Sequence, residues 1–148
     1  IFIKLNKALP KYITRFPIKK QEITRSILAN KNNLRKIIKI IHPEVRKKMN
    51  IFIKKNKRKK FVILDIPLLL ENKINRKKDI LIFVESKKGE IFKRLKKRKN
   101  FNFKIIDKFK KIQLSLDYKK KKSEFIIKNN FTKRFIKKQI KDILKQIH

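Results

Sequence analysis

The chain has 148 residues, of which 47 are Lys or Arg and only 11 are Asp or Glu, so its formal net charge is +36. This charge favours nucleic acid as a partner at first sight. However, the chain has 38 Lys, 27 Ile, 12 Asn and 12 Phe residues, and all four types have codons made only of A and T. An AT-rich genome therefore accounts for much of the positive charge. Cysteine is absent, which excludes disulfides, thiolate metal sites and Cys nucleophiles, and no apolar run approaches the roughly 18 to 20 residues of a membrane span.

Glycine is almost absent as well, since Gly89 is the only one in the chain. A GxxxxGK(S/T) loop and a GxGxxG turn both need several glycines, because their backbone amides close on a phosphate group. Neither loop exists within these residues, so any phosphate-binding loop is expected outside them. The chain also begins with Ile1 rather than Met, and we interpret it as a fragment that holds one domain of ordinary size.

Residues 1–58 are predicted to be helical. Asn30 is the predicted N-cap of the segment that follows it. Pro43 disfavours helical geometry at the residue before it and suits the first turn of a helix, so we expect one helix to break at His42 and another to run to about Lys57. Apolar side chains recur at helical spacing between Lys and Arg residues, at Leu28, Leu34, Ile37, Ile38 and Ile41.

The pattern changes at Phe61, where residues 61–67 form a short apolar run that ends in Pro67. Its length and β-branched content predict a strand buried on both faces. Similar runs follow at 80–84 and 125–127. Strands of this kind belong to parallel sheets with helical crossovers. We therefore expect the three strands to be parallel and adjacent, and we predict the α/β fold class.

Helices are predicted between and after these strands. Residues 88–97 form the first, and the Lys-rich segment 102–122 keeps apolar residues at helical spacing. The last helix covers about 132–146, with Thr132 as its predicted N-cap. The chain shows no internal repeat and no linker rich in Ser or Pro.

Asp65 is the most informative acidic residue, because it lies within an apolar run. An ionised carboxylate there is costly unless it is paired, binds a metal or lies at the end of the strand. Ligands bind at the carboxyl ends of strands in open α/β sheets, so one interpretation is a carboxylate that faces a ligand or Mg²⁺. The other is an Asp that caps the next turn, and its position alone leaves both open.

The remaining candidates also have a structural interpretation. His42 and His148 are the two histidines, so a metal site with several His ligands is not available, and a single His is more often structural. Glu71 can cap or pair within the fold. Arg94 and Arg98 share a helical face and carry the planar fork of donors that suits phosphate, but among 47 basic residues a solvated face explains them as well.

Five sequence elements follow one another along the chain. A His-Pro-x-x-Arg-like element lies at 42–46, and a V-x-D-x-P-L-L-x-E-like run lies at 62–71. An R-x-x-x-R pair at 94–98 comes next, then a Q-x-P-L-x-x-K-like stretch at 113–119 and an A-D-x-x-I-x-N-like strand at 123–130. In this order they resemble the dephospho-CoA kinase family, P-loop kinases that phosphorylate the ribose 3′-hydroxyl of dephospho-CoA.

The chain departs from the pattern of this family in several places. Lys99 stands where Asp usually follows the second Arg, and Phe109 and Lys110 stand where an Arg-Ile pair is common in the lid. Ser115 replaces a frequent Pro, and Phe131 stands where Gly is common after the Asn. The family's first strand, its P-loop and the following strand with a catalytic Asp have no counterpart here.

The resemblance implies a P-loop nucleotide-kinase-like parallel sheet with a helical substrate domain and a helical lid, from which the N-terminal strands are missing. It divides the chain into four parts. These are a helical CoA-binding region (1–58), an α/β core (59–99), the lid (100–122) and the C-terminal strand and helix of the core (123–148).

The resemblance also implies in-line transfer of the γ-phosphate of MgATP, a reaction that rests mostly on positioning and charge stabilisation. Asp65 is expected near the acceptor and is a candidate Mg²⁺ ligand. Arg98 is expected to move in from the lid and neutralise developing charge. The other implied contacts are to the substrate at His42, Arg46 and Glu71, and to the nucleotide at Asn129 and Asn130.

The implied enzyme is cytoplasmic, uses ATP and Mg²⁺, and binds nucleic acid only non-specifically through its charge. These 148 residues alone are expected to be inactive, because they contain no phosphate loop. The alternative is a small basic nucleic-acid-binding protein, such as a ribosome-associated one, since phosphate contacts by Lys and Arg drive non-specific binding. One continuous basic face with interleaved aromatic residues would favour the alternative, whereas a diffuse basic coat would favour the kinase.

Overall fold

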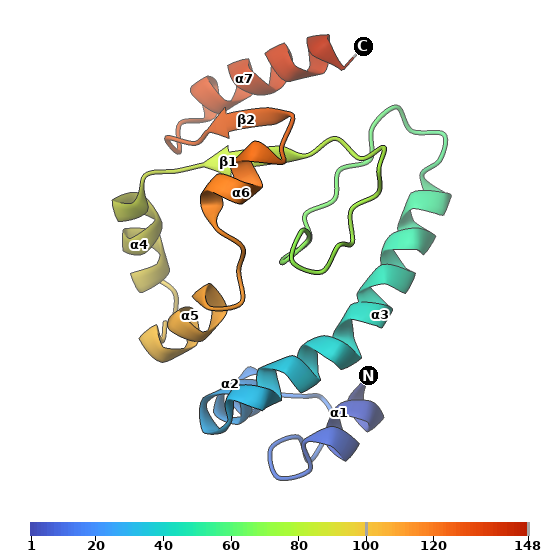
Figure 1. The fold of residues 1–148 in the computed structure, drawn as a ribbon, viewed down its shortest axis with the longest axis vertical. Helices are drawn as coiled ribbons and strands as arrows, with labels where there is room; N and C mark the ends of the chain where they lie inside the picture. The colour runs from blue at the N-terminus through green and yellow to red at the C-terminus, as the bar shows by residue number, and fades with distance from the viewer. Residues whose placement is uncertain (100, 148) are drawn as a thin grey trace. The chain divides into compact units, whose positions relative to one another are not determined.

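The computed structural model describes residues 1–99 and 101–147, so His148 and Asn100, the first residue of the predicted lid, lie outside the described part. The chain has a mixed α/β fold (Figure 1). It divides into two units, the first made of Ile1–Pro67 and Phe103–Lys111 and the second of Leu68–Asn102 and Ile112–His148.

Three helices make up most of the first unit, namely α1 (Phe2–Ala8), α2 (Lys20–Ala29) and α3 (Lys31–Lys55). They confirm the helical prediction for most of residues 1–58, whereas residues 9–19 form turns and a loop. Asn30 is the N-cap of α3, as predicted, because its Oδ1 accepts a hydrogen bond from the Asn32 N–H at 2.8 Å. The core of this unit consists of apolar residues from the three helices and the loop after α1, namely Leu5, Leu9, Ile13, Ile27, Leu34 and Ile37.

α3 continues through Pro43, so the predicted break at His42 is wrong. Pro43 has no N–H to donate to the Lys39 carbonyl, and a proline inside a helix costs about 3 kcal/mol relative to Ala. Tertiary contacts offset this cost. α3 packs against α1 and α2 and buries Leu34 and Ile37, and burying an apolar side chain of this size contributes roughly 1.5–3 kcal/mol.

Two buried polar side chains lie where α2 meets α3, and one of them, Asn33, bonds the two helices together. The Asn33 Nδ2 donates to the Ser26 carbonyl at 2.8 Å, and the Ser26 Oγ donates to the Ile23 carbonyl at 2.9 Å. Asn33 is 6% exposed and Ser26 is fully buried. Leaving the Asn33 amide unpaired would cost about 1–3 kcal/mol, so its bond to the Ser26 carbonyl favours one pairing of the two helices.

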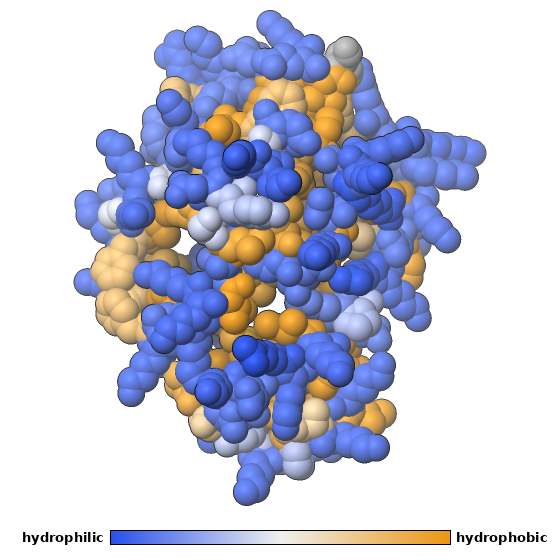
Figure 2. Space-filling view, in the orientation of Figure 1, coloured by the Kyte–Doolittle hydropathy of each residue, from blue (hydrophilic) through white to orange (hydrophobic). Residues whose placement is uncertain are grey.

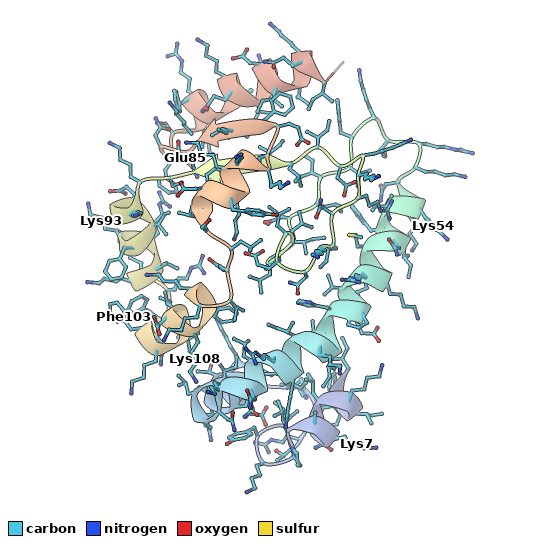
Figure 3. All side chains as sticks on the ribbon, viewed as in Figure 1. Lys7, Lys54, Glu85, Lys93, Phe103 and Lys108 are labelled. Atoms are coloured by element: carbon cyan, nitrogen blue, oxygen red, sulfur yellow. The ribbon has the colours of Figure 1, made fainter. Side chains whose placement is uncertain are left out.

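α5 (Phe103–Lys110) also belongs to the first unit, where it packs against α2. Figure 3 labels Phe103 and Lys108 on this helix. The Lys108 Nζ donates to the carbonyl oxygens of Ile27 and Leu28 at 2.6 and 3.2 Å. These carbonyls lie in the last turn of α2, where carbonyl groups lack helical partners and a cation is favoured by the helix dipole.

We expect Lys108→Met to destabilise the first unit by about 1–2 kcal/mol, because it removes charge-assisted hydrogen bonds from the end of α2. Equilibrium urea denaturation followed by circular dichroism measures the change. Lys111→Met is the matched control, since the Lys111 ammonium pairs with the exposed Asp107 at 2.8 Å and such surface pairs contribute about 0.3–0.5 kcal/mol. Equal losses in the two variants would contradict the role of Lys108.

The sheet lies in the second unit and has two parallel strands, β1 (Ile82–Glu85) and β2 (Phe125–Lys128). Ile82 is opposite Phe125, and the register continues to the ends of both strands. This pair confirms two of the three predicted strands and their parallel direction.

α7 (Lys133–Gln146) packs against β2, and Figure 1 shows it running along this strand. It begins after Thr132, the predicted N-cap, although the Thr132 side chain makes no capping hydrogen bond. Ile127 of β2 and Ile143 of α7 are less than a tenth exposed. They contribute to a small core in which the helix covers the sheet.

Residues 61–66 are not a strand in the structure, so the prediction of a third sheet member is wrong. The side chains of this segment alternate between exposed and half-buried, and Ile63 is 88% exposed. A strand buried on both faces needs neighbouring strands and covering helices. Within the described residues the sheet consists of β1 and β2, and neither pairs with this segment.

The helices predicted around the lid are only partly confirmed. α4 (Lys88–Lys96) forms where expected. The segment 102–122 forms α5 and then a separate helix, α6 (Leu116–Lys121). Ser115 starts α6, because its Oγ accepts a hydrogen bond from the Tyr118 N–H at 3.2 Å. The local capping interaction therefore interrupts an apolar pattern that is continuous in sequence.

Candidate functional site

His42 and Arg46, two of the predicted substrate contacts, lie on one face of α3 and line the same hollow of about 680 Å³. Figure 3 shows Lys54, another lining residue, near the end of this helix. Several cationic side chains along one face suit an anionic ligand, and the guanidinium of Arg46 has the fork geometry that binds phosphate. The other lining residues follow at helical spacing and are Lys39, Pro43, Lys47, Asn50 and Ile51.

Asp65 is exposed and belongs to the first unit, where it lies near the end of the segment Ile1–Pro67. It is not among the residues that line the hollow on α3 or a second hollow of about 570 Å³ beside α5. The expected position at the tip of a sheet strand is not found, because residues 61–66 do not pair in the sheet. Its catalytic role stays a prediction.

Arg98, the predicted lid arginine, lies two residues after the end of α4 in the second unit. Its N–H donates to the Leu95 carbonyl at 3.1 Å, and its carbonyl accepts from the Phe101 N–H at 2.9 Å. The backbone is thus held in a turn, while the residue is exposed. Its role in charge neutralisation stays a prediction.

Arg94, the other member of the R-x-x-x-R pair, lies over the ring of Phe131, with its Cζ 3.7 Å from the ring centroid. Phe131 has a φ of 63°, in the left-handed region that favours glycine. A bulky residue thus adopts this conformation at a position where Gly is common in the family that the sequence resembles. A cation–π contact of this kind contributes about 0.5–1 kcal/mol at an exposed site and offsets part of the strain.

Asn129 and Asn130, the predicted nucleotide contacts, follow β2 and hold the loop that leads to α7. The Asn129 Oδ1 accepts from the Phe131 N–H at 2.8 Å, and the Asn130 Oδ1 accepts from the Thr132 N–H at 3.0 Å. Short side chains that bond to the backbone two residues ahead stabilise turns of this kind. Both amides therefore lie at the carboxyl end of a parallel strand, where ligands bind in α/β folds.

Glu71 has a side chain that is only 8% exposed. Its Oε1 accepts from the Leu114 N–H at 3.0 Å and pairs with the Lys119 Nζ at 2.6 Å. Burial by itself raises the pKa of Glu71, but the hydrogen bond with Lys119, backbone hydrogen bonds at Glu71 and Leu114, and the charge of Lys119 together outweigh burial and bring the pKa below its ordinary value. The carboxylate is therefore ionised and engaged inside the fold.

A second ion pair lies beside the first. Lys120, next to Lys119 on α6, pairs with Glu85 at the end of β1 at 2.8 Å, and Figure 3 shows Glu85 next to α6. The hydrogen bond with Lys120 lowers the pKa of Glu85. Neither lysine is among the predicted site residues. Lys119 ends the Q-x-P-L-x-x-K-like stretch, which is a signal for its importance, whereas no pattern marks Lys120.

Within the described residues, His, Asp and Glu side chains form no group of three or more that could hold a metal ion. Mg²⁺ keeps several waters and is often held by one or two carboxylates together with substrate phosphates. A single exposed carboxylate such as Asp65 fits that mode and does not fit a metal site built from protein ligands alone.

The basic residues do not gather on one element, because each of the described helices carries Lys or Arg. Figure 2 shows hydrophilic side chains spread over the face in view, with hydrophobic residues between them. This distribution agrees with a diffuse basic coat. None of the described helices is both long enough and apolar enough to cross a membrane.

Comparison with known proteins identifies the family. The family model for dephospho-CoA kinase matches residues 14–134, a range that contains every predicted site residue. A dephospho-CoA kinase of Wolbachia pipientis wMel is 29% identical over 144 residues, which are 96% of this chain and 73% of the relative. That of Rickettsia conorii is 30% identical over 95% of this chain and 72% of the relative.

A dephospho-CoA kinase of Bacillus cereus is 33% identical over 124 residues, which are 81% of this chain and 61% of the relative. The five motifs at 42–46, 62–71, 94–98, 113–119 and 123–130 all fall inside the matched region. On these grounds the chain belongs to the dephospho-CoA kinase family.

Proposed function

We propose that this chain supplies the substrate-binding and phosphate-transfer residues of an ATP-dependent kinase. The enzyme transfers the γ-phosphate of ATP to the ribose 3′-hydroxyl of dephospho-CoA, the last step of coenzyme A synthesis. The observation that carries the proposal is the family match over residues 14–134. The cationic hollow on α3 supports it, because dephospho-CoA is anionic through its pyrophosphate group.

The helical first unit provides the binding residues in this proposal. Arg46 binds a phosphate group of dephospho-CoA, and His42 donates or accepts a hydrogen bond beside it, since both line the same hollow. The helical region 1–58 is then the CoA-binding part of the chain. The core at 59–99, the lid at 100–122 and the core segment 123–148 complete the proposed division.

Catalysis in the proposal depends on positioning and on charge. Asp65 orients the acceptor hydroxyl, and Arg98 neutralises charge that develops on the transferred phosphoryl group. Asn129 and Asn130 contact the nucleotide from the end of β2. ATP is the phosphate donor, and Mg²⁺ enters with its phosphates, with Asp65 as the candidate protein ligand. The cytoplasmic location stays a prediction.

We also propose that the phosphate-binding loop and the strands beside residues 61–66 lie outside these 148 residues. The single glycine, Gly89, supports the first part, because no phosphate loop can be built with it. The exposure of Ile63 (88%) and of Val84 in β1 (56%) supports the second part. Apolar strand residues of a P-loop-kinase sheet are expected to be covered by neighbouring elements.

The alternative of a nucleic-acid-binding protein is not favoured. The family match explains the five motifs in order, which charge alone does not, and the basic residues lie on every described helix. Weak RNA binding at low salt is expected from the charge in either case. A complex with RNA that persists at physiological salt would support the alternative.

Calorimetric titration of the chain with dephospho-CoA tests the proposal. We expect measurable binding, and we expect Arg46→Ala to raise the Kd about tenfold or more, because a charge-assisted bond to phosphate contributes roughly 1.5–3 kcal/mol. Lys48→Ala is the control, since Lys48 is exposed on α3 but does not line the hollow. Equal weakening by the two variants would indicate attraction by net charge alone and would contradict the site.

The proposal also predicts that the 148 residues transfer no phosphate from ATP by themselves. A coupled assay for ADP formation in the presence of dephospho-CoA measures this. Transfer above the background rate would contradict the placement of the phosphate loop outside these residues.

A further inference from the structure

One carboxylate, with a side chain that is 8% exposed, holds the last segment of the predicted lid. The Glu71 Oε1 accepts from the Leu114 N–H at 3.0 Å and pairs with the Lys119 Nζ at 2.6 Å. Leu114 precedes α6 (Leu116–Lys121), and Lys119 lies within it. Glu71 therefore binds both the chain that enters this helix and the helix itself.

Glu71 is presented by a turn that has its own hydrogen bonds. The Asn72 N–H donates to the Leu68 carbonyl at 3.2 Å, and the Ile74 N–H donates to the Leu69 carbonyl at 3.1 Å. Ile74 is 6% exposed, so the end of the turn is packed. A carboxylate on such a turn has a defined position, which makes it suitable as a fixed acceptor.

The position of this contact in the chain is informative. The chain passes from the first unit to the second after Pro67 and again after Lys111. Glu71 follows the first passage by a few residues, and Leu114 follows the second. The hydrogen bond between Glu71 and Leu114 therefore links the two segments with which the chain enters the second unit.

We propose that Glu71 is a positioning residue that anchors the returning end of the lid, rather than a ligand of the substrate. An ionised carboxylate that is 8% exposed is stable only when it is paired. Two donors already share its Oε1, so a substrate would have to compete with them for this oxygen. The positioning role in catalysis rests on the proposed kinase function, whereas the contacts of Glu71 with Leu114 and Lys119 do not depend on that function.

The neighbouring pair of Lys120 and Glu85 provides a matched comparison. It also connects α6 to another segment, at 2.8 Å, but its side chains are 43% and 39% exposed. Exposed pairs are weakened by solvent and salt. If burial decides which contact holds α6 in place, the Glu71–Lys119 pair stabilises its position more than the Glu85–Lys120 pair does.

Amide hydrogen exchange of the chain tests the anchor. In Glu71→Ala we expect exchange at Leu114 and through α6 to accelerate about tenfold or more, with α7 unchanged, because local opening then needs no ion pair to break. Glu71→Gln keeps an oxygen that can accept from the Leu114 N–H. Compared with Glu71→Ala, it should therefore recover part of the protection at Leu114 but not the ion pair with Lys119. Glu85→Gln should leave exchange at Leu114 unchanged.

Titration of the same variants with dephospho-CoA separates the two roles of Glu71. A positioning residue predicts that Glu71→Gln binds dephospho-CoA within about threefold of the wild type. Unchanged exchange at Leu114 in both Glu71 variants would overturn the anchor, and weakened binding without a change in exchange would make Glu71 a substrate ligand. If the wild-type chain binds no dephospho-CoA, the proposed function fails, while the exchange data still decide on the anchor.

Discussion

Lys119→Met is expected to destabilise the second unit by about 3 kcal/mol at pH 7, because it leaves the Glu71 carboxylate buried without its charge partner. The Glu71 side chain is 8% exposed and that of Lys119 is 20% exposed, so water replaces the lost ammonium poorly. Equilibrium urea denaturation measures the change. Lys120→Met removes the neighbouring, exposed ammonium and is expected to leave the urea midpoint unchanged within error.

The loss in Lys119→Met is expected to depend on pH. The pKa of Glu71 in the folded chain lies below its ordinary value, which is about 4.3 in an unfolded chain. The ionised carboxylate therefore stabilises the fold at pH values above about 4.3, and this contribution is lost as the pH falls through the folded pKa. A difference between Lys119→Met and wild type that persists unchanged in acid would contradict the ion pair as its cause.

Ile37→Ala is expected to destabilise the first unit by about 3 kcal/mol. Ile37 lies on α3, is 5% exposed and belongs to the core that joins α3 to its neighbours. Its truncation removes buried apolar area and leaves a cavity, and substitutions of this type cost about 2–5 kcal/mol. Urea denaturation followed by circular dichroism measures the loss.

The control for this prediction lies on the same helix. Ile51 is 45% exposed, so Ile51→Ala is expected to cost less than about 1 kcal/mol. Equal losses in the two variants would mean that α3 is stabilised by its helical propensity and not by packing. The substitution at position 37 should also lower the affinity for dephospho-CoA, because α3 carries His42 and Arg46.

Local patterns predicted the elements whose stability is mostly local or short-range. The side chain of Asn30 caps α3, α4 and α7 form where the periodicity places them, and β1 and β2 pair in parallel. In each case the signal comes from consecutive residues: a capping side chain, a period of 3.6 or a short β-branched run. These signals were sufficient because the partners lie within the described chain.

The candidate site was predicted less completely than the helices and strands. The motif at 42–46 placed His42 and Arg46 together, and both line one hollow on α3. The partners of Glu71 could not be predicted, since Leu114 and Lys119 are distant from it in sequence and the motif at 113–119 does not say which residue its members contact. The stack of Arg94 on Phe131 is similar, because it depends on how α4 and the loop after β2 fold together.

The sequence by itself determined the family, through five short motifs in order, and the positions of most helices, through their apolar period and caps. Only the tertiary structure decided that α3 continues through Pro43, that residues 61–66 stay outside the sheet, and that Glu71 is engaged by Leu114 and Lys119. The physical reason is the same in all three cases. A helix interior tolerates proline when packing offsets the lost hydrogen bond, a strand exists only with a partner, and a buried carboxylate stays ionised only beside a cation. Each of these conditions depends on residues that are distant in sequence.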